Sequence, residues 1–257
     1  MACSQRDCSG EASVRGYRVY RRLLASALLA SALLAGCDRA DPQAAGQAQA
    51  AAAQQAVEKR AHDFDAAYAA ENWELATAHG DVLLREHPDS PHAARIAPLH
   101  AQARQKVEAA REQHRLRSLW DYGREAVKGG SQLSASIYSR DPVDVDGSGP
   151  KPVRLIFRDH PDWGRSAYLV LESGDFRCPG GCKVKVRIDD AAAKAIAATR
   201  PKTDEAIAMF IEDHRMLWRS LRDVRTASIE FPVKSGGTRT AVFEVGGLDR
   251  GKLPAWN

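Results

Sequence analysis

The chain has 257 residues, a formal net charge of +4 and 44% hydrophobic residues. That length allows one large or two small domains, and the hydrophobic content is that of a globular protein with a packed core. The net charge is too small to indicate nucleic-acid binding.

The N-terminal region has the layout of a secretory signal. The apolar run LLASALLASALLAGC extends from Leu23 to Cys37 and ends in small residues. Basic residues precede it, namely Arg15, Arg18, Arg21 and Arg22. The run is well short of the roughly 20 apolar residues that a membrane-spanning helix needs. A basic region, a short apolar region and small residues at a cleavage point predict export of the chain.

The end of this run, Leu34-Ala35-Gly36-Cys37, resembles the lipobox of bacterial lipoproteins. The resemblance implies that residues 1–36 are a signal peptide, that Cys37 carries a diacylglyceryl group, and that its new amine is acylated. Several acyl chains anchor a protein stably. We therefore expect a protein of the cell envelope, lipid-anchored to a membrane with its folded part in the periplasm. The sequence does not decide between anchoring to the inner and to the outer membrane. Either Met1 or Val14 can be the translation start.

Residues 37–53 are rich in Ala, Gln, Gly and Pro and predict a flexible tether. Residues 54–130 predict a helical segment, because apolar residues recur there at spacings of three and four. We expect helices over about 54–71 and 73–86. A third helix should run to about Lys128, with a kink or restart at Pro98 and an end at Gly129-Gly130.

Part of the helical segment resembles a tetratricopeptide-type hairpin. The residues that carry the resemblance are Tyr68, Asn72-Trp73, Ala76, Leu83-Leu84, Pro88-Asp89-Ser90-Pro91 and Ala93-Ala94. Their spacing is similar to repeats in lipoproteins that assist outer-membrane barrel assembly. A solenoid needs about three stacked repeats. Because this chain has one helix pair and a long third helix, we expect a small three-helix bundle.

Residues 131–257 predict an antiparallel β-rich domain, because the hydrophobic period changes to two. Strands are expected over about 134–139, 153–157, 167–171, 184–188, 207–211, 228–233 and 240–245, with one covering helix over 213–222. Residues 191–198 have helical propensity but lie where a returning strand would pair, so both remain open. The predicted fold class is α+β, with two parts that fold separately around Gly129-Gly130. The alternative is that the third helix completes the core of the sheet.

The C-terminal half resembles an uncharacterised module found at the ends of bacterial envelope and secreted proteins. The resemblance is carried by Cys178, Gly181-Cys182, Val184, Val186 to Asp189, Pro201, Phe210-Ile211, Leu221, Ile229-Glu230 and Phe243 to Leu248. We know of no activity attached to this pattern, so it implies no site.

Cys178 and Cys182 enclose Pro-Gly-Gly and predict a disulfide that pins a tight turn in an oxidising compartment. A thiol redox motif would have two intervening residues, and a zinc site would need two more ligands. Asp141, Asp144 and Asp146 suggest a calcium loop. Its register fails, because a proline and a valine fall at the first and twelfth positions.

A basic stripe, Arg177, Lys183, Lys185 and Arg187, is a candidate anion-binding surface, with the solvated face of a strand as the alternative. The histidines, among them His87, His92, His100 and His160, are expected in surface or capping roles. No motif for nucleophilic catalysis or phosphate binding is present. We therefore expect no catalytic residues, no metal and no cofactor.

These observations favour a non-enzymatic binding or assembly module, held at the membrane through Cys37 with a protein partner in the envelope and no nucleic acid. Two alternatives come from other classes. One is an inhibitor or immunity-type lipoprotein that blocks an envelope enzyme or toxin. The other is a hydrolase that acts on cell-wall material.

Overall fold

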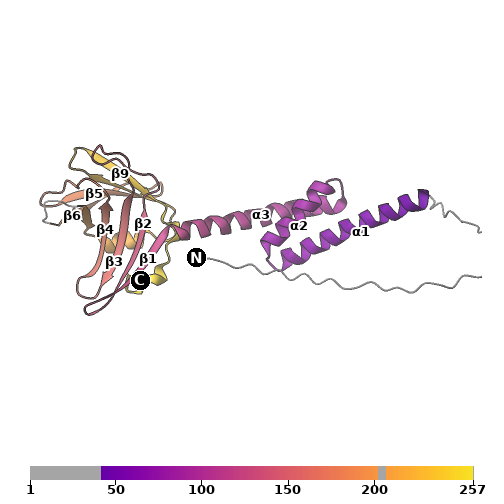
Figure 1. The fold of residues 1–257 in the computed structure, drawn as a ribbon, viewed down its shortest axis with the longest axis horizontal. Helices are drawn as coiled ribbons and strands as arrows, with labels where there is room; N and C mark the ends of the chain where they lie inside the picture. The colour runs from indigo at the N-terminus through magenta and orange to yellow at the C-terminus, as the bar shows by residue number, and fades with distance from the viewer. Residues whose placement is uncertain (1–41, 202–206, 257) are drawn as a thin grey trace, which may run out of the picture. The chain divides into compact units, whose positions relative to one another are not determined.

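The computed structural model describes residues 42–201 and 207–256, so the signal peptide, the lipobox and Cys37 lie outside the described residues. Residues 51–257 form one compact unit, and 42–50 are the described part of the other. The described chain has the predicted α+β class, with three N-terminal helices followed by an antiparallel sheet (Figure 1). Within these ranges no helix combines the length and apolarity that crossing a bilayer requires.

The helical segment contains α1 (Pro42–Ala69), α2 (Trp73–Glu86) and α3 (Pro91–Ser118). The expected tether is helical from Pro42 onward, because alanine and glutamine are strong helix formers and proline suits the first helical position. The Asn72 side chain caps α2 by accepting the N–H of Leu75, and α3 continues through Pro98.

The helices enclose their own apolar cluster, and His100 lies inside it rather than on the surface. The His100 side chain is buried and its Nε2 is 2.8 Å from Asp81 Oδ1. Gly80 leaves room for the ring, since a Cβ there would lie 2.4 Å from His100 Cδ2. The cluster otherwise consists of apolar residues: Ala61, Phe64, Ala67, Ala76, Leu83, Ala93, Ile96 and Ala103.

The expectation that the third helix continues to about Lys128 is wrong. α3 ends at Ser118, and β1 (Trp120–Val127) pairs residue by residue with β2 (Gly130–Tyr138). Gly129 and Gly130 have φ of 90° and 149°, which suits the turn of this hairpin. The two glycines therefore join strands instead of ending a helix. Trp120, the first residue of β1, is buried in the core of the sheet.

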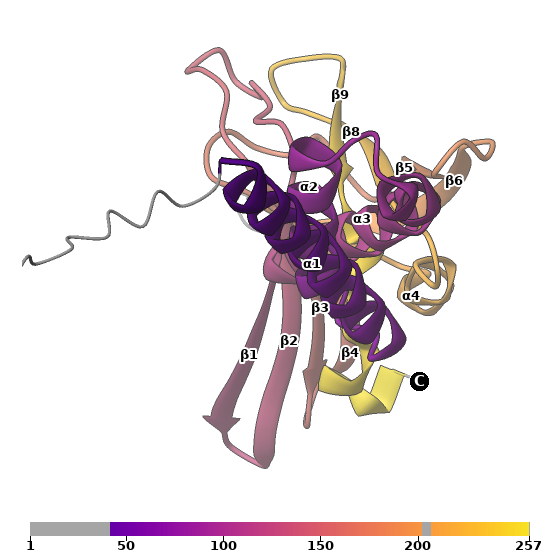
Figure 2. The same cartoon turned by 90° about the vertical axis from the view of Figure 1, so that its right-hand side faces the viewer.

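The sheet has nine strands in the order β1-β2-β3-β4-β7-β6-β5-β8-β9, all in antiparallel pairs (Figures 1 and 2). The remaining strands are β3 (Val153–His160), β4 (Gly164–Leu171), β5 (Cys182–Ile188), β6 (Lys194–Thr199), β7 (Ala208–Ile211), β8 (Ala227–Pro232) and β9 (Thr238–Phe243). The ambiguous residues 191–198 thus contribute most of strand β6. Beyond β2, the Arg140 N–H donates to Val242 O of β9 at 2.7 Å.

One face of every long strand is directed into a second apolar cluster. In β3 the buried residues Val153, Leu155 and Phe157 alternate with partly exposed ones. The predicted covering helix is α4 (His214–Ser220), which adds Leu217 and Trp218 to this core. The structure thus has two apolar cores. The helical part gives way to the sheet at Leu119, between α3 and β1. That the two parts fold independently stays a prediction.

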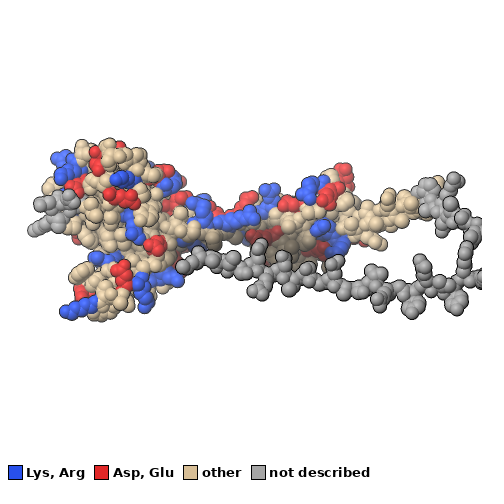
Figure 3. Space-filling view, viewed as in Figure 1, with Lys and Arg blue, Asp and Glu red and all other residues tan. Residues whose placement is uncertain are grey.

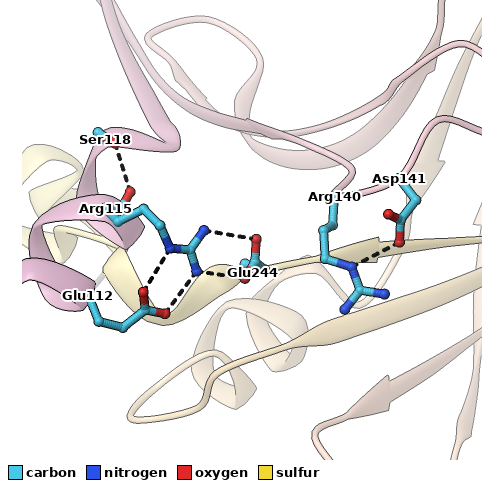
Figure 4. Close-up of polar contacts among 6 residues, drawn as sticks. All are labelled: Glu112, Arg115, Ser118, Arg140, Asp141 and Glu244. Carbon is cyan, nitrogen blue, oxygen red and sulfur yellow. Dashed lines mark hydrogen bonds and ion pairs between the residues drawn. The ribbon is translucent and has the colours of Figure 1, made fainter. Parts of the chain in front are cut away.

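The end of α3 is held against the C-terminal part of the sheet domain by a forked ion pair. Arg115 donates to Glu112 on its own helix at 2.8 Å and to Glu244, just after β9, at 2.7 Å (Figure 4). Next to it, Gly247 lies in a short 3-10 turn, Val245–Gly247, directly against the α3 backbone. A Cβ on Gly247 would lie 2.2 Å from both the carbonyl carbon and oxygen of Leu116.

We predict that Gly247→Ala lowers the free energy of unfolding by about 2 kcal/mol or more, because two backbone segments would have to separate. Gly246→Ala is the matched control, since its Cβ would meet Val224 O at the less severe distance of 3.2 Å. Urea unfolding measures both. Equal stability of the Gly247→Ala variant and the parent would show that the two segments are not packed this closely.

Asp189 links the end of β5 to the start of β8. Its carboxylate accepts the N–H groups of Thr226 at 2.7 Å and Arg225 at 3.1 Å. The N–H of Thr226 is the main cause that holds the pKa of Asp189 below its ordinary value, and the Thr226 hydroxyl and the Arg225 N–H act in the same direction. Because the pKa is lowered in the folded state, the ionised carboxylate stabilises the fold above the unfolded pKa of about 3.9.

We predict that Asp189→Asn destabilises the protein at neutral pH, and that its deficit shrinks as the pH falls through the lowered pKa of the native carboxyl. Urea unfolding of parent and variant at about pH 7 and about pH 3 compares the two. A deficit that stays constant down to pH 3 would contradict the role of the charged form.

Candidate binding surface

The outward face of the central strands carries aromatic and arginine side chains. On β2, β3, β4 and β7 these residues alternate with the buried ones. We call this face, together with the β3–β4 turn, the aromatic–arginine surface, and it consists of Tyr138, Arg154, Ile156, Arg158, Trp163, Tyr168 and Phe210. Tyr138 is 49% exposed and Trp163 is 70% exposed, which is unusual for side chains of this size.

Strand register places the middle of this surface in one row. Ile156 of β3 is paired with Tyr168 of β4, and Tyr168 with Phe210 of β7. The rings of Tyr168 and Phe210 are 5.1 Å apart between centroids. Directly opposite residues on a sheet face contact one another. The row therefore forms a continuous apolar strip across three strands.

Arg158 lies beside this strip with its guanidinium over two rings. Its Cζ is 5.3 Å from the Trp163 ring centroid and 5.4 Å from that of Tyr168. Over residues 42–201 and 207–256 it makes no ion pair, and its buried Nε has no hydrogen-bond partner. Aromatic faces attract a cation without neutralising it. Arg158 thus presents a held positive charge next to apolar surface.

Arg154, unlike Arg158, has polar partners within the described part of the sheet. It donates to Asp121 at 3.1 Å and to Ser136 Oγ at 2.7 Å, and its Cζ is 5.3 Å from the Tyr138 ring centroid. Its charge is therefore already paired.

The exposed Trp163 is fixed by the turn that carries it. His160, which is buried, accepts the N–H of Asp162 at 3.1 Å and that of Trp163 at 3.3 Å through Nδ1. The rings of His160 and Trp163 stack with centroids 4.0 Å apart. Of the two roles expected for His160, surface or capping, the structure has the second, because the buried ring accepts backbone N–H groups of the turn. A large aromatic side chain that is both exposed and held in place is suited to contact with a partner.

The predicted basic stripe lies on strand β5 and on the loop that precedes it. Lys183, Lys185 and Arg187 are exposed on β5, and Lys185 pairs with Glu230 of β8 at 2.8 Å. Arg177 lies in the loop before β5, beside the cysteine pair. On the face drawn in Figure 3, basic and acidic residues are interspersed over the sheet domain. The stripe on β5 is therefore part of a surface of mixed charge, and anion binding by these four residues stays a prediction.

The predicted disulfide between Cys178 and Cys182 is confirmed, with their Cα atoms 5.0 Å apart. It closes a turn that borders an open groove of about 710 Å³, which we call the disulfide groove. Arg177, Arg200 and Lys234 also line this groove. Only Arg177 and the cysteines were singled out from the sequence, because the other two come from distant segments.

The aspartate loop after β2 uses its carboxylates internally. Asp144 Oδ1 accepts the N–H of Gly147 at 2.7 Å, and Asp146 Oδ1 accepts the N–H and the hydroxyl of Ser148. These are local turn contacts. Among the residues the structure describes, no group of three or more His, Cys, Asp or Glu is placed to hold a metal ion.

No protein-family model and no curated protein sequence matches this chain. Among solved structures, the chain is similar to the crystal structure of invasion associated protein B from Bartonella henselae. The match has 14% sequence identity and a TM-score of 0.36, and covers 54% of this chain and 91% of that one. A likeness this distant carries no information about function.

Proposed function

We propose that this protein is a non-enzymatic binding module of the cell envelope, anchored to a membrane through Cys37, which docks a protein partner on the aromatic–arginine surface. The observation that carries the proposal is Arg158, an arginine without an ion pair in the described chain, held between Trp163 and Tyr168 on an exposed sheet face. Export and anchoring rest on the lipobox sequence. The tetratricopeptide-like hairpin belongs to the same proposal, as a helical spacer before the sheet.

The composition of the surface supports a protein as the ligand. Tyrosine, tryptophan and arginine are enriched where alanine substitution most weakens protein–protein binding. The strip is also part of a regular sheet, whose side chains lose little freedom when a partner docks. Trp163 also loses little freedom on docking, because its contacts with His160 already hold it in place.

Charge indicates what the partner brings. Arg154 is paired with Asp121, whereas Arg158 makes no ion pair within the described ranges. A carboxylate from the partner would form an ion pair with the Arg158 guanidinium, whose position the two rings already fix. Charge-assisted pairs of this kind are strong. The neighbouring Ile156 and Phe210 require apolar side chains beside it. We therefore expect a protein segment with Asp or Glu next to aliphatic or aromatic residues.

The lipid anchor would favour such an interaction without further contacts. A tethered module meets partners of the same compartment at a high effective concentration. In this proposal a moderate affinity of the sheet face is therefore sufficient.

Photocrosslinking in intact cells tests the proposal. A photoreactive phenylalanine replaces Tyr168 or Phe210 in the full chain, and Thr240, exposed on the outward face of β9, is the control position. We predict the same adduct from both surface positions and none from Thr240. Adducts that are shared with Thr240, or differ between the two neighbouring positions, would contradict docking on this face.

The partner identified in this way allows a quantitative test. We predict that Arg158→Gln and Trp163→Ala each weaken its binding about 30-fold, the loss expected for a residue that contributes about 2 kcal/mol. Lys185→Gln, on the paired basic stripe, should leave affinity unchanged. Thermal unfolding of each variant confirms that the fold is kept. Equal affinity of all three variants would remove Arg158 and Trp163 from the interface.

A further inference from the structure

The disulfide groove gathers positive side chains from three separate segments of the chain. Arg177 follows β4, Arg200 follows β6 and Lys234 follows β8. The topology brings them together, because β5, β6 and β8 are consecutive in the sheet and the Phe176–Val233 bridge adds the segment after β4. The described lining contains no acidic side chain.

Backbone or side-chain contacts hold each of these three residues in place. Arg200 Nη1 donates to Phe176 O at 3.1 Å, and the Arg177 N–H donates to Pro232 O at 3.1 Å. Lys234 Nζ is 3.0 Å from Asp175 Oδ2, and its N–H donates to Asp175 O at 2.9 Å. The Arg200 guanidinium and the Lys234 ammonium are oriented by these contacts, whereas Arg177 is held at its backbone. Lys234 shares its charge with Asp175, but an ammonium has three N–H donors and keeps others for a ligand.

The turn closed by the disulfide leaves one side of this groove uncovered by side chains. Cys178 is buried, whereas Gly180 and Gly181 are exposed with φ of 68° and 107°. Their positive φ requires glycine, and no side chain of theirs stands over the groove. The disulfide holds Cys182 to the buried Cys178, so the turn cannot swing away from Arg177.

We infer that the disulfide groove binds a phosphate-class oxyanion through Arg177, Arg200 and Lys234. Guanidinium groups match the oxygen geometry of phosphate, and a lysine adds a point charge. The groove is open, so it accepts a phosphate that is part of a larger molecule as well as a free ion. The inference is independent of the proposed function, since no residue of the aromatic–arginine surface lines the groove.

Inorganic phosphate is the first probe, added to the chain without its first 37 residues, so that neither the apolar signal run nor a lipid anchor contributes. We predict that phosphate raises the thermal unfolding midpoint more than chloride does at equal ionic strength, as a ligand of the folded state must. Arg177→Ala and Lys234→Ala should each weaken phosphate binding about 10-fold or more, the loss of a charge-assisted contact.

Lys185→Ala and Arg187→Ala are the matched controls, because they remove cations from the exposed face of β5. Both should bind phosphate like the parent. Arg177→Lys keeps the positive charge but removes the planar guanidinium that can bind two phosphate oxygens at once. Intermediate binding by this variant would show that the guanidinium geometry contributes to the site. Equal losses in groove and stripe variants would overturn the inference, because they would show a general charge effect.

Vesicles distinguish a free phosphate from a lipid headgroup. Co-sedimentation of the same chain, which lacks the first 37 residues, with phosphatidylglycerol vesicles, lost in Arg177→Ala and kept in Lys185→Ala, would identify a headgroup as the source. Phosphate binding without vesicle binding would identify a free phosphate. Binding of neither probe above the chloride control would refute the groove as an anion site.

Discussion

The packing of Phe157 against Trp218 and Trp256 fixes the orientation of strand β3, and the surface described above depends on it. The three rings lie with centroids 5.0 to 5.4 Å apart, where β3 meets α4 and the C-terminal turn. Because side chains alternate along a strand, burying Phe157 turns Ile156 and Arg158 outward. A shift of one residue would reverse both faces and place Arg158 in the core, at a prohibitive cost in desolvation.

The apolar side chains left exposed on the outward face lower the stability of the fold, and burial in the core must offset this loss. Exposed Trp163 and Tyr138 add apolar surface that water disfavours, and Arg158 is without a carboxylate within the described chain. Fully burying a large apolar side chain is worth about 1.5–3 kcal/mol, so a few residues left outside are tolerated when the core is large. A partner that covers this face would recover the same energy, which connects the packing of β3 to a binding role.

The sequence predicts most of this structure where one segment contains the whole signal. Alternation in residues 184–188 and the capped helix over 213–222 are local patterns, and the cysteine pair lies within five residues. β1 was missed, because it follows a helix directly and its Gly129-Gly130 turn equally suits a helix end. The aromatic–arginine surface was missed for another reason. Ile156, Tyr168 and Phe210 meet through strand register, and the strand order β4-β7-β6-β5 cannot be derived from spacing along the chain.

Hydroxyl-radical footprinting of Trp163 tests the central claim most directly, by comparing the purified protein with the protein in intact cells. Trp163 is 70% exposed in the isolated chain and should oxidise rapidly there. Trp218, 1% exposed, reports whether the fold is intact in both samples. A covered aromatic–arginine surface predicts that Trp163 is protected in cells while Trp218 stays unreactive in both. Equally fast oxidation of Trp163 in cells and in the purified protein would contradict a docked partner on this face.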